Sequence, residues 1–389
     1  MKQLNHISSL IILLASLTAC DHSDMPIQHA DDYDYITFSV ETGKMLTRTN
    51  AYEAYDPARH PATMGVFGYY DLADYSALTR AADDEEPMVG ITLKPNPVFN
   101  NGTVTYNAAT TTWSTAVSKP WNDYKGATTF DFFAYMPQTE GATLGRTATG
   151  TYSLSVPFAM PDGAPFLTDT KAAPIICAMP DHKAGTTSDG SQFTFDRTVK
   201  FKFDQTLVGY KLLFMLDARM NNLRQFRIKR VALSGTIATG GTVSRTYTWD
   251  DEDGWSAQNI QWTLNRQTVT NAPVAYVDSD DQAYDNQAQT LLATAAGYKQ
   301  WGSTLYFVPD AQFQPTITVT YDVELLAEDG TTVITRKDVT SDIVLNKSNF
   351  STLASGQMAM INPVRILIQP RYLYVLADDD AYTGHLLIE

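Results

Sequence analysis

Apolar residues at every second position are the feature that most limits how this chain can fold. Val199, Phe201 and Phe203 alternate with Lys200 and Lys202, and the same period of two recurs along the chain. Side chains of a β-strand point to opposite faces in turn, so this alternation predicts strands with one buried and one solvated face. No segment of a dozen residues carries an apolar stripe at the helical period. The sequence therefore predicts an all-β fold.

The alternating segments are short and are separated by Gly, Pro, Asn and Asp. Further examples are residues 36–40, 129–136, 226–229, 317–325 and 364–368. Asp329 and Gly330 follow one of these segments and precede residues 332–335, which predicts a β-hairpin. Many short strands with such turns are typical of β-sandwiches and barrels.

The chain of 389 residues is long enough for two domains of ordinary size. The segment 181–190 is rich in small and polar residues and precedes a new series of strand-like segments. We therefore predict two β-sandwich domains in tandem, an N-terminal domain of residues 35–191 and a C-terminal domain of residues 192–389.

The N-terminus has the pattern of a secretory signal peptide. Lys2 precedes an apolar run at residues 7–17, and this run ends in Leu-Thr-Ala before Cys20. The run is shorter than the roughly 20 apolar residues that span a bilayer. A cysteine after small residues resembles a lipobox, which implies cleavage before Cys20 and a lipid (palmitate) on its thiol. The alternative is an ordinary signal peptide with an incidental cysteine.

This pattern predicts a signal peptide at residues 1–19 and export as a lipoprotein of the outer membrane, exposed at the cell surface. Residues 20–34 are acidic and polar, which predicts a tether between the lipid and the folded body. The formal net charge of −15 argues against nucleic acid as a partner. With Cys20 lipidated, Cys177 has no partner for a disulfide, and its apolar neighbours predict a buried, inert thiol.

Sequence motifs for catalysis are absent. We find no G-x-S-x-G, P-loop, H-E-x-x-H or Rossmann glycine pattern, and the histidines do not pair at a metal-ligand spacing. Acidic clusters at residues 250–253 and 378–380 lack the alternating spacing of a Ca²⁺ loop, so we predict solvated turns there. We therefore predict that the protein binds no metal and no cofactor and is not an enzyme. A hydrolase stays a minor alternative, because paired carboxylates can converge from distant positions.

Three tryptophans lie close together in the sequence and are candidates for contact with a glycan. Trp249, Trp255 and Trp262 fall within a short polar stretch. Aromatic side chains can stack on sugar rings, although large aromatics in a β-protein more often belong to the core. A surface glycan-binding lipoprotein is therefore the main alternative function.

Several longer motifs, in order along the chain, resemble those of a known family. A Lys-Pro-Trp motif at residues 119–121 precedes residues 130–137 (FDFFAYMP), and residues 198–207 (TVKFKFDQTL), 226–235 (FRIKRVALSG) and 305–309 (LYFVP) follow. Together with the lipoprotein start, these motifs resemble the fimbrillin family, the pilus subunits and related surface lipoproteins of Bacteroidales. Gln205 stands where the family pattern has a histidine. The resemblance implies two tandem transthyretin-like, Greek-key sandwiches.

The resemblance also implies a mechanism of assembly. In the family, an arginine-specific protease removes the first strand, and a strand of the next subunit fills the apolar groove that this opens. The matching features here are the strand at residues 35–40 and a cleavage site between Arg48 and Thr49. The candidate donor is the C-terminal segment 372–389, with its apolar residues Tyr372, Leu373, Val375, Leu386 and Ile388.

The implied partners are other fimbrial subunits in a head-to-tail polymer, the outer membrane through the lipid, and a host or bacterial surface receptor. Two alternatives remain open at this point. The tail can complete its own sandwich, and Arg48 can be an ordinary loop arginine.

Overall fold

The computed structural model describes residues 34–43, 52–70, 96–124, 126–148, 150–187, 192–217, 224–274, 290–292, 297–300, 302–345, 361–369 and 385–388. These residues form strands and two short 3₁₀ turns, η2 (Trp121–Tyr124) and η3 (Pro161–Gly163). The predicted all-β fold is therefore confirmed.

Nine of the described strands form the first sheet. They are β1 (Thr37–Gly43), β2 (Tyr52–Ala54), β3 (Thr63–Tyr70), β4 (Asn96–Asn107), β5 (Thr112–Thr115), β6 (Thr129–Met136), β9 (Ile175–Cys177), β10 (Asp181–Ala184) and β11 (Thr198–Gln205). Seven of them close into a ring in the order β6, β3, β4, β5, β1, β11 and β9, because β9 pairs with β6 again. Of the other two, β10 pairs with β6 and β2 pairs with β1.

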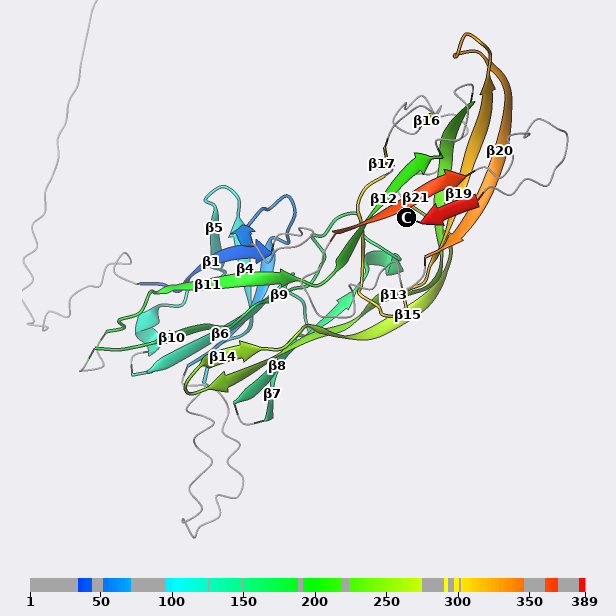
Figure 1. The fold of residues 1–389 in the computed structure, drawn as a ribbon. Coiled ribbons are helices and arrows are strands. Elements are labelled where there is room, and N and C mark those ends of the chain that lie inside the picture. Colours follow the sequence, from blue (N-terminus) through cyan, green and yellow to red (C-terminus); the bar gives the residue numbers. More distant parts are fainter. Residues whose placement is uncertain are drawn as a thin grey trace, which may run out of the picture.

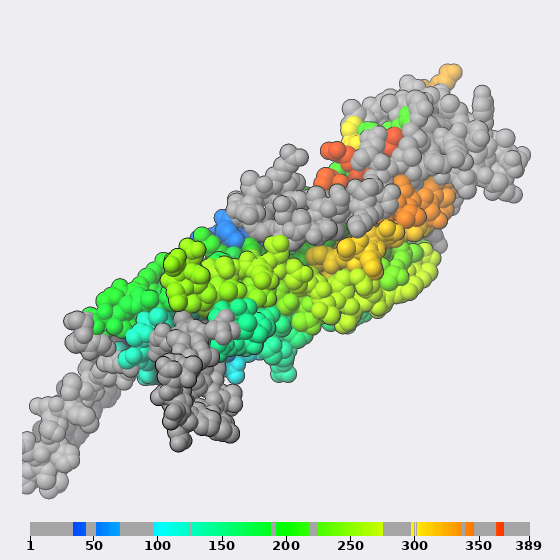
Figure 2. Space-filling view, turned by 60° about the horizontal axis from the view of Figure 1, so that its bottom comes forward, coloured from blue at the N-terminus to red at the C-terminus, as the bar shows by residue number. Residues whose placement is uncertain are grey.

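A second sheet of eight described strands is built around one very long strand. Its members are β7 (Thr143–Ala148), β8 (Thr151–Ala159), β13 (Arg224–Asp250), β14 (Gly254–Ala257), β15 (Gln261–Pro273), β16 (Thr290–Leu292), β19 (Thr316–Leu326) and β20 (Val333–Val344). β13 pairs with β19 at its N-terminal end and with β8 and β14 at its C-terminal end. It therefore runs through both halves of the molecule (Figure 1), and the residues of β13–β15 form a yellow-green band on one face in Figure 2.

The third sheet contains five described strands. They are β12 (Val208–Leu216), β17 (Lys299–Gln300), β18 (Leu305–Phe307), β21 (Ile361–Gln369) and β22 (His385–Ile388). β21 runs parallel to β12, and β22 pairs antiparallel with β21. The predicted hairpin at Asp329 and Gly330 is confirmed, since β19 and β20 pair antiparallel around it.

Two large hydrophobic cores hold these sheets together. The first joins the ring to the second sheet and includes Phe133 and Phe201 from the ring, together with Tyr247 from β13 and Trp255 from β14. The second lies between the other two sheets and includes Phe226, again from β13. The single strand β13 thus contributes buried side chains to both cores.

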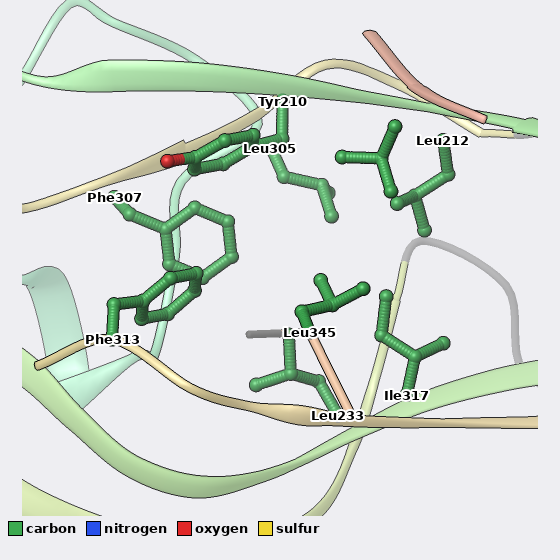
Figure 3. Close-up of a pocket in the computed structure, with 9 residues that line it drawn as sticks. Tyr210, Leu212, Leu233, Leu305, Phe307, Phe313, Ile317 and Leu345 are labelled. Atoms are coloured by element: carbon green, nitrogen blue, oxygen red, sulfur yellow. The ribbon is translucent and has the colours of Figure 1, made fainter. Parts of the chain in front are cut away.

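The second core contains a small apolar cavity, whose nine lining residues appear in Figure 3. The rings of Tyr210, Phe307 and Phe313 lie on one side of it, and Leu212 and Ile317 lie on the other. The space is about 10 Å³, close to the least volume that holds one water molecule. Such a cavity is a packing imperfection rather than a ligand site, since ligand pockets measure hundreds of Å³.

The predicted pair of tandem sandwiches is not confirmed. Seven strands between residues 37 and 205 close into a ring, and β13 belongs to a sheet that contributes to both cores. Alternation predicts which side chains of a strand are buried, but it carries no information on whether a sheet closes on itself. The domain boundary near residue 191 stays a prediction.

Candidate functional site

The first strand, β1, occupies an inner position of the ring rather than an edge. On one side it runs parallel to β11, from Thr37 opposite Thr198 to Thr42 opposite Phe203. On its other side it meets β5 at one residue and β2 along its C-terminal end. We call this place between β11 and the two shorter strands the β1 position; Figure 1 shows β1 and β11 side by side there. Both backbone edges of β1 thus have neighbours.

The inward face of β1, together with the residue directly before the strand, carries three apolar side chains. Ile36, Phe38 and Val40 are each less than 10% exposed. The ring of Phe38 packs against Phe99 at 5.9 Å and against Phe201 at 6.3 Å between centroids. Burying an apolar side chain of this size stabilises the fold by about 2 kcal/mol, so each of these three residues contributes to holding β1 in the ring.

The fourth inward position of β1 is polar. Thr42 is fully buried, and its Oγ1 lies 3.0 Å from Nε2 of the buried His60. Nδ1 of the same ring lies 3.4 Å from the side-chain nitrogen of Gln205 on β11. Burial lowers the pKa of His60 to about 4, with a further lowering by the positive charge of Arg59. His60 is therefore neutral at pH 7 and hydrogen-bonds the end of β1.

Strand β2 pairs with β1, and its side chains also contact other parts of the molecule. The hydroxyl of Tyr52 donates to Asp204 at 2.7 Å, and Nη1 of Arg245 approaches the other oxygen of that carboxylate at 2.5 Å. Burial and the bond to Asp204 raise the pKa of Tyr52. Just after β2, the ring of Tyr55 packs on Trp113 at 4.8 Å between centroids. These contacts fix the chain that follows β1.

The residues predicted for processing and anchoring lie outside the described residues. Arg48 and Thr49 belong to the segment between the end of β1 at Gly43 and the start of β2 at Tyr52. Cys20 precedes the first described residue, Asp34. Cleavage at Arg48 and lipidation of Cys20 therefore stay predictions.

The predicted donor segment is described only at its end. Tyr372, Leu373 and Val375 lie outside the described residues. Leu386 and Ile388 belong to β22, where they stand opposite Ile368 and Ile366 of β21. Residues 385–388 are thus paired with their own chain here, and strand donation stays a prediction.

The three candidate tryptophans do not form one surface. Trp249 and Trp255 face each other across β13 and β14, with ring centroids 5.4 Å apart. Trp255 is 8% exposed and donates from Nε1 to Asp131 at 2.6 Å, so it belongs to the first core. Trp262 on β15 packs against Phe158 instead. Contact with a glycan stays a prediction, and Trp249, half-buried, is the better placed of the first pair.

A polar cluster that the sequence patterns did not single out lies beside Trp249. Asp131 on β6 is fully buried and lies 2.7 Å from Nδ1 of His182 on β10. The ring of His182 lies 4.6 Å from that of Trp249. Its only sequence signal is an aspartate within the otherwise apolar segment FDFFAYM. The cluster links β6, β10, β13 and β14 through polar and aromatic contacts.

Cys177 is a free, buried thiol, as predicted. The backbone N–H of Ala134 donates to its sulfur at 3.3 Å, and burial raises its pKa. In the part of the chain that the structure describes, no three His, Cys, Asp or Glu side chains are grouped so that they could hold a metal ion. Within the same residues, no helix has the length and apolar character needed to cross a membrane.

No protein-family model matches the sequence, and no curated protein matches it. Among solved structures, the fold is similar to proteins of Bacteroides whose names assign or propose a fimbrial or cell adhesion role. This is the class of protein that the sequence motifs resemble.

One of these structures is a fimbrial protein from Bacteroides vulgatus, with 14% sequence identity, coverage of 92% of this chain and 99% of that chain, and a TM-score of 0.46. Two others, whose names propose cell adhesion, come from Bacteroides uniformis and Bacteroides ovatus. The first has 12% identity, coverage of 93% and 99%, and a TM-score of 0.36. The second has 11% identity, coverage of 92% and 96%, and a TM-score of 0.37. At these identities the likeness does not by itself assign a function.

Proposed function

We propose that this chain is a structural subunit of a cell-surface fimbria that serves adhesion and assembles by exchange of a strand between subunits. The observation that carries the proposal is the placement of β1. This strand is one of the strands of the ring, and the segment 44–51, which contains Arg48, links it to the strands that follow in the sequence. A single cut there separates β1 from every strand that follows.

Loss of β1 has a defined physical consequence. β11 would lose its parallel partner, so its N–H and C=O groups on that side would be unpaired. The apolar surface covered by Ile36, Phe38 and Val40 would be exposed to water. A strand from another subunit removes both costs at once, because it restores the ladder and fills the apolar face.

Assembly by this route is directional. The vacated position lies near the start of the chain, and the proposed donor is the C-terminal segment 372–389, so each subunit receives at one end and donates at the other. Such a head-to-tail contact does not close and therefore propagates as a filament. Because residues 385–388 pair with β21 in the single chain, donation requires that this short pairing open. The lipid on Cys20 would hold the uncut precursor at the outer membrane.

The test is N-terminal sequencing of the protein recovered from the cell surface, together with a denaturing gel of unboiled sample. We expect a new N-terminus at Thr49 and a ladder of oligomers. The matched control is Arg48→Ala, which should keep the original N-terminus and run as a single monomer band. A wild-type protein that keeps residues 20–48 and stays monomeric in the presence of an arginine-specific protease would contradict the proposal.

A glycan-binding surface lipoprotein is the second candidate function, and one observation favours it. Trp249 is half-buried, and its ring packs at a tilt against that of His182, which leaves part of an aromatic pair at the surface. Such pairs provide an apolar face with a polar edge, which suits a sugar ring. Retention of the wild type on immobilised polysaccharide, lost in Trp249→Ala, would support this function. No retention on a broad panel of polysaccharides would exclude it.

A further inference from the structure

The β1 position has two chemically different ends. Along most of its length the inward face of β1 is apolar, but its last inward residue, Thr42, meets the buried ring of His60. Next to this ring, among the described residues, Oε1 of Gln205 is buried without a hydrogen-bond partner. Of the two ring nitrogens of His60, one contacts Gln205 and the other contacts the hydroxyl of the strand that occupies the position.

We propose that this polar end determines the register of any strand that replaces β1. The position accepts a strand with three alternating apolar side chains followed, two residues later, by a side chain that hydrogen-bonds His60. This inference rests on the proposed function, because it concerns the strand that enters after β1 has left.

The reason is the cost of burying a polar group without a partner. When the position is empty, water can reach the ring of His60; when a strand enters, that water is expelled. An apolar side chain at the fourth position would then leave a buried ring nitrogen unpaired, which costs about 1–3 kcal/mol. A strand shifted by two residues makes the same error and also places its polar side chain against Phe201.

The chain around the β1 position also has contacts that do not involve β1. Tyr52 is held by Asp204, and Tyr55 donates to the carbonyl of Pro61 at 2.9 Å, directly beside His60. The contacts of Tyr52 and Tyr55 therefore remain available to hold this part of the chain near His60 when β1 leaves. A preformed receiving surface of this kind loses little conformational freedom on binding.

The partner that fits is a strand of a second copy of this chain. In the C-terminal segment, Leu373, Val375 and Ala377 are followed by Asp379 at the spacing of Ile36, Phe38, Val40 and Thr42. The carboxylate of Asp379 is a strong hydrogen-bond acceptor for a ring N–H. Residues 373–379 therefore carry the pattern that the position requires, in the same chain direction as β1.

The experiment uses the full chain with a site for a sequence-specific protease inserted at Arg48. After the cut, the β1 fragment is exchanged for a labelled peptide of residues 34–43, and unlabelled variants of this peptide compete. We expect the Thr42→Ser peptide to compete within about threefold of the wild type and the Thr42→Val peptide to be weaker on the order of tenfold. The Phe38→Ala peptide is the control for loss of apolar contact.

A second measurement isolates His60. In a cut chain with His60→Leu, the preference for threonine over valine should disappear, while His60→Gln, which keeps a hydrogen-bonding side chain, should retain it. Equal competition by the Thr42→Val and wild-type peptides in the unsubstituted chain would overturn the proposal, and so would a failure of any peptide to exchange. The peptide series decides the question even if His60→Leu does not fold.

A peptide of residues 371–380 tests the partner. We expect it to compete with the β1 peptide and to lose this ability with Asp379→Leu; no competition would overturn the assignment of this segment. These outcomes are separate from that of the proposed function. Subunits cut at Arg48 that never form oligomers would contradict the fimbrial role while leaving the peptide preference intact.

Discussion

Replacing Asp204 by Asn is expected to destabilise the fold strongly, because it removes the counter-charge of a buried arginine. The carboxylate of Asp204 on β11 lies 2.5 Å from Nη1 of Arg245 and accepts a hydrogen bond from Tyr52. The side chains of Asp204 and Arg245 are only 10% and 12% exposed. The guanidinium also donates to the carbonyl of Cys177, at 3.2 Å, so after the substitution it would keep hydrogen bonds but lose its charge partner.

The expected loss follows from comparing this ion pair with an exposed one. Removing one partner of a buried pair costs about 3–5 kcal/mol, because the remaining charge stays desolvated. Asp196 and Lys200 form a pair of the same length, 2.5 Å, but their side chains are 54% and 61% exposed. A pair so exposed contributes about 0–1 kcal/mol. Asp204→Asn should therefore lower the free energy of unfolding by about 3 kcal/mol more than Asp196→Asn.

Urea unfolding at pH 7, followed by tryptophan fluorescence, measures both variants against the wild type. Adding Arg245→Met to Asp204→Asn should recover part of the loss, since it removes the unpaired charge. The reasoning is refuted if Asp204→Asn and Asp196→Asn differ by less than about 1 kcal/mol, or if the double variant is less stable than Asp204→Asn alone.

Three further predictions concern other parts of the fold. His60 has a pKa lowered to about 4 against an ordinary 6.5, so its contribution to stability is complete above pH 6.5 and falls by up to about 3 kcal/mol towards pH 4; unfolding of His60→Gln should depend less on pH in that range. Trp255→Ala should cost about 3–5 kcal/mol in urea unfolding, and Trp249→Ala clearly less, because only the first side chain is buried in the core. Gly241→Ala should prevent folding or lower the thermal midpoint far more than Gly145→Ala, since a Cβ at Gly241 would lie 1.9 Å from a backbone oxygen and one at Gly145 meets nothing within 4 Å.

The strands were the most predictable part of this protein. β6 covers residues 129–136, the predicted apolar segment, and β11 and β19 include the alternating residues that predicted them. This succeeds because burial on one face of a sheet requires a period of two, whatever the partners of the strand are. Pairing was less predictable, since the parallel contact of β1 with β11 joins residues that are far apart in the sequence.

Buried charge was also missed, for a related reason. Asp322 and Glu324 alternate with the apolar residues of β19 and were expected on the solvated face, yet they are 1% and 0% exposed. Glu324 lies 2.5 Å from Arg336 on β20 and 3.1 Å from Arg227 on β13. The long side chains of these arginines cover the carboxylates, and this covering depends on which strands lie on either side.

The dependence of burial on neighbouring strands also explains why the sequence predicted β1 as a strand but did not predict the polar contact at its C-terminal end. The alternation of Ile36, Phe38 and Val40 identified a strand with a buried face, and Thr42 then looked like the point where burial ends. In the structure Thr42 is the most deeply buried residue of the four, because His60 follows β2 and lies against it. Gln205 stands where the family pattern has a histidine, and here it contacts the ring of His60. A histidine is thus present at this end of β1, but it comes from a different part of the chain. Its contact with Thr42 becomes visible only once the three-dimensional packing around β1 is known.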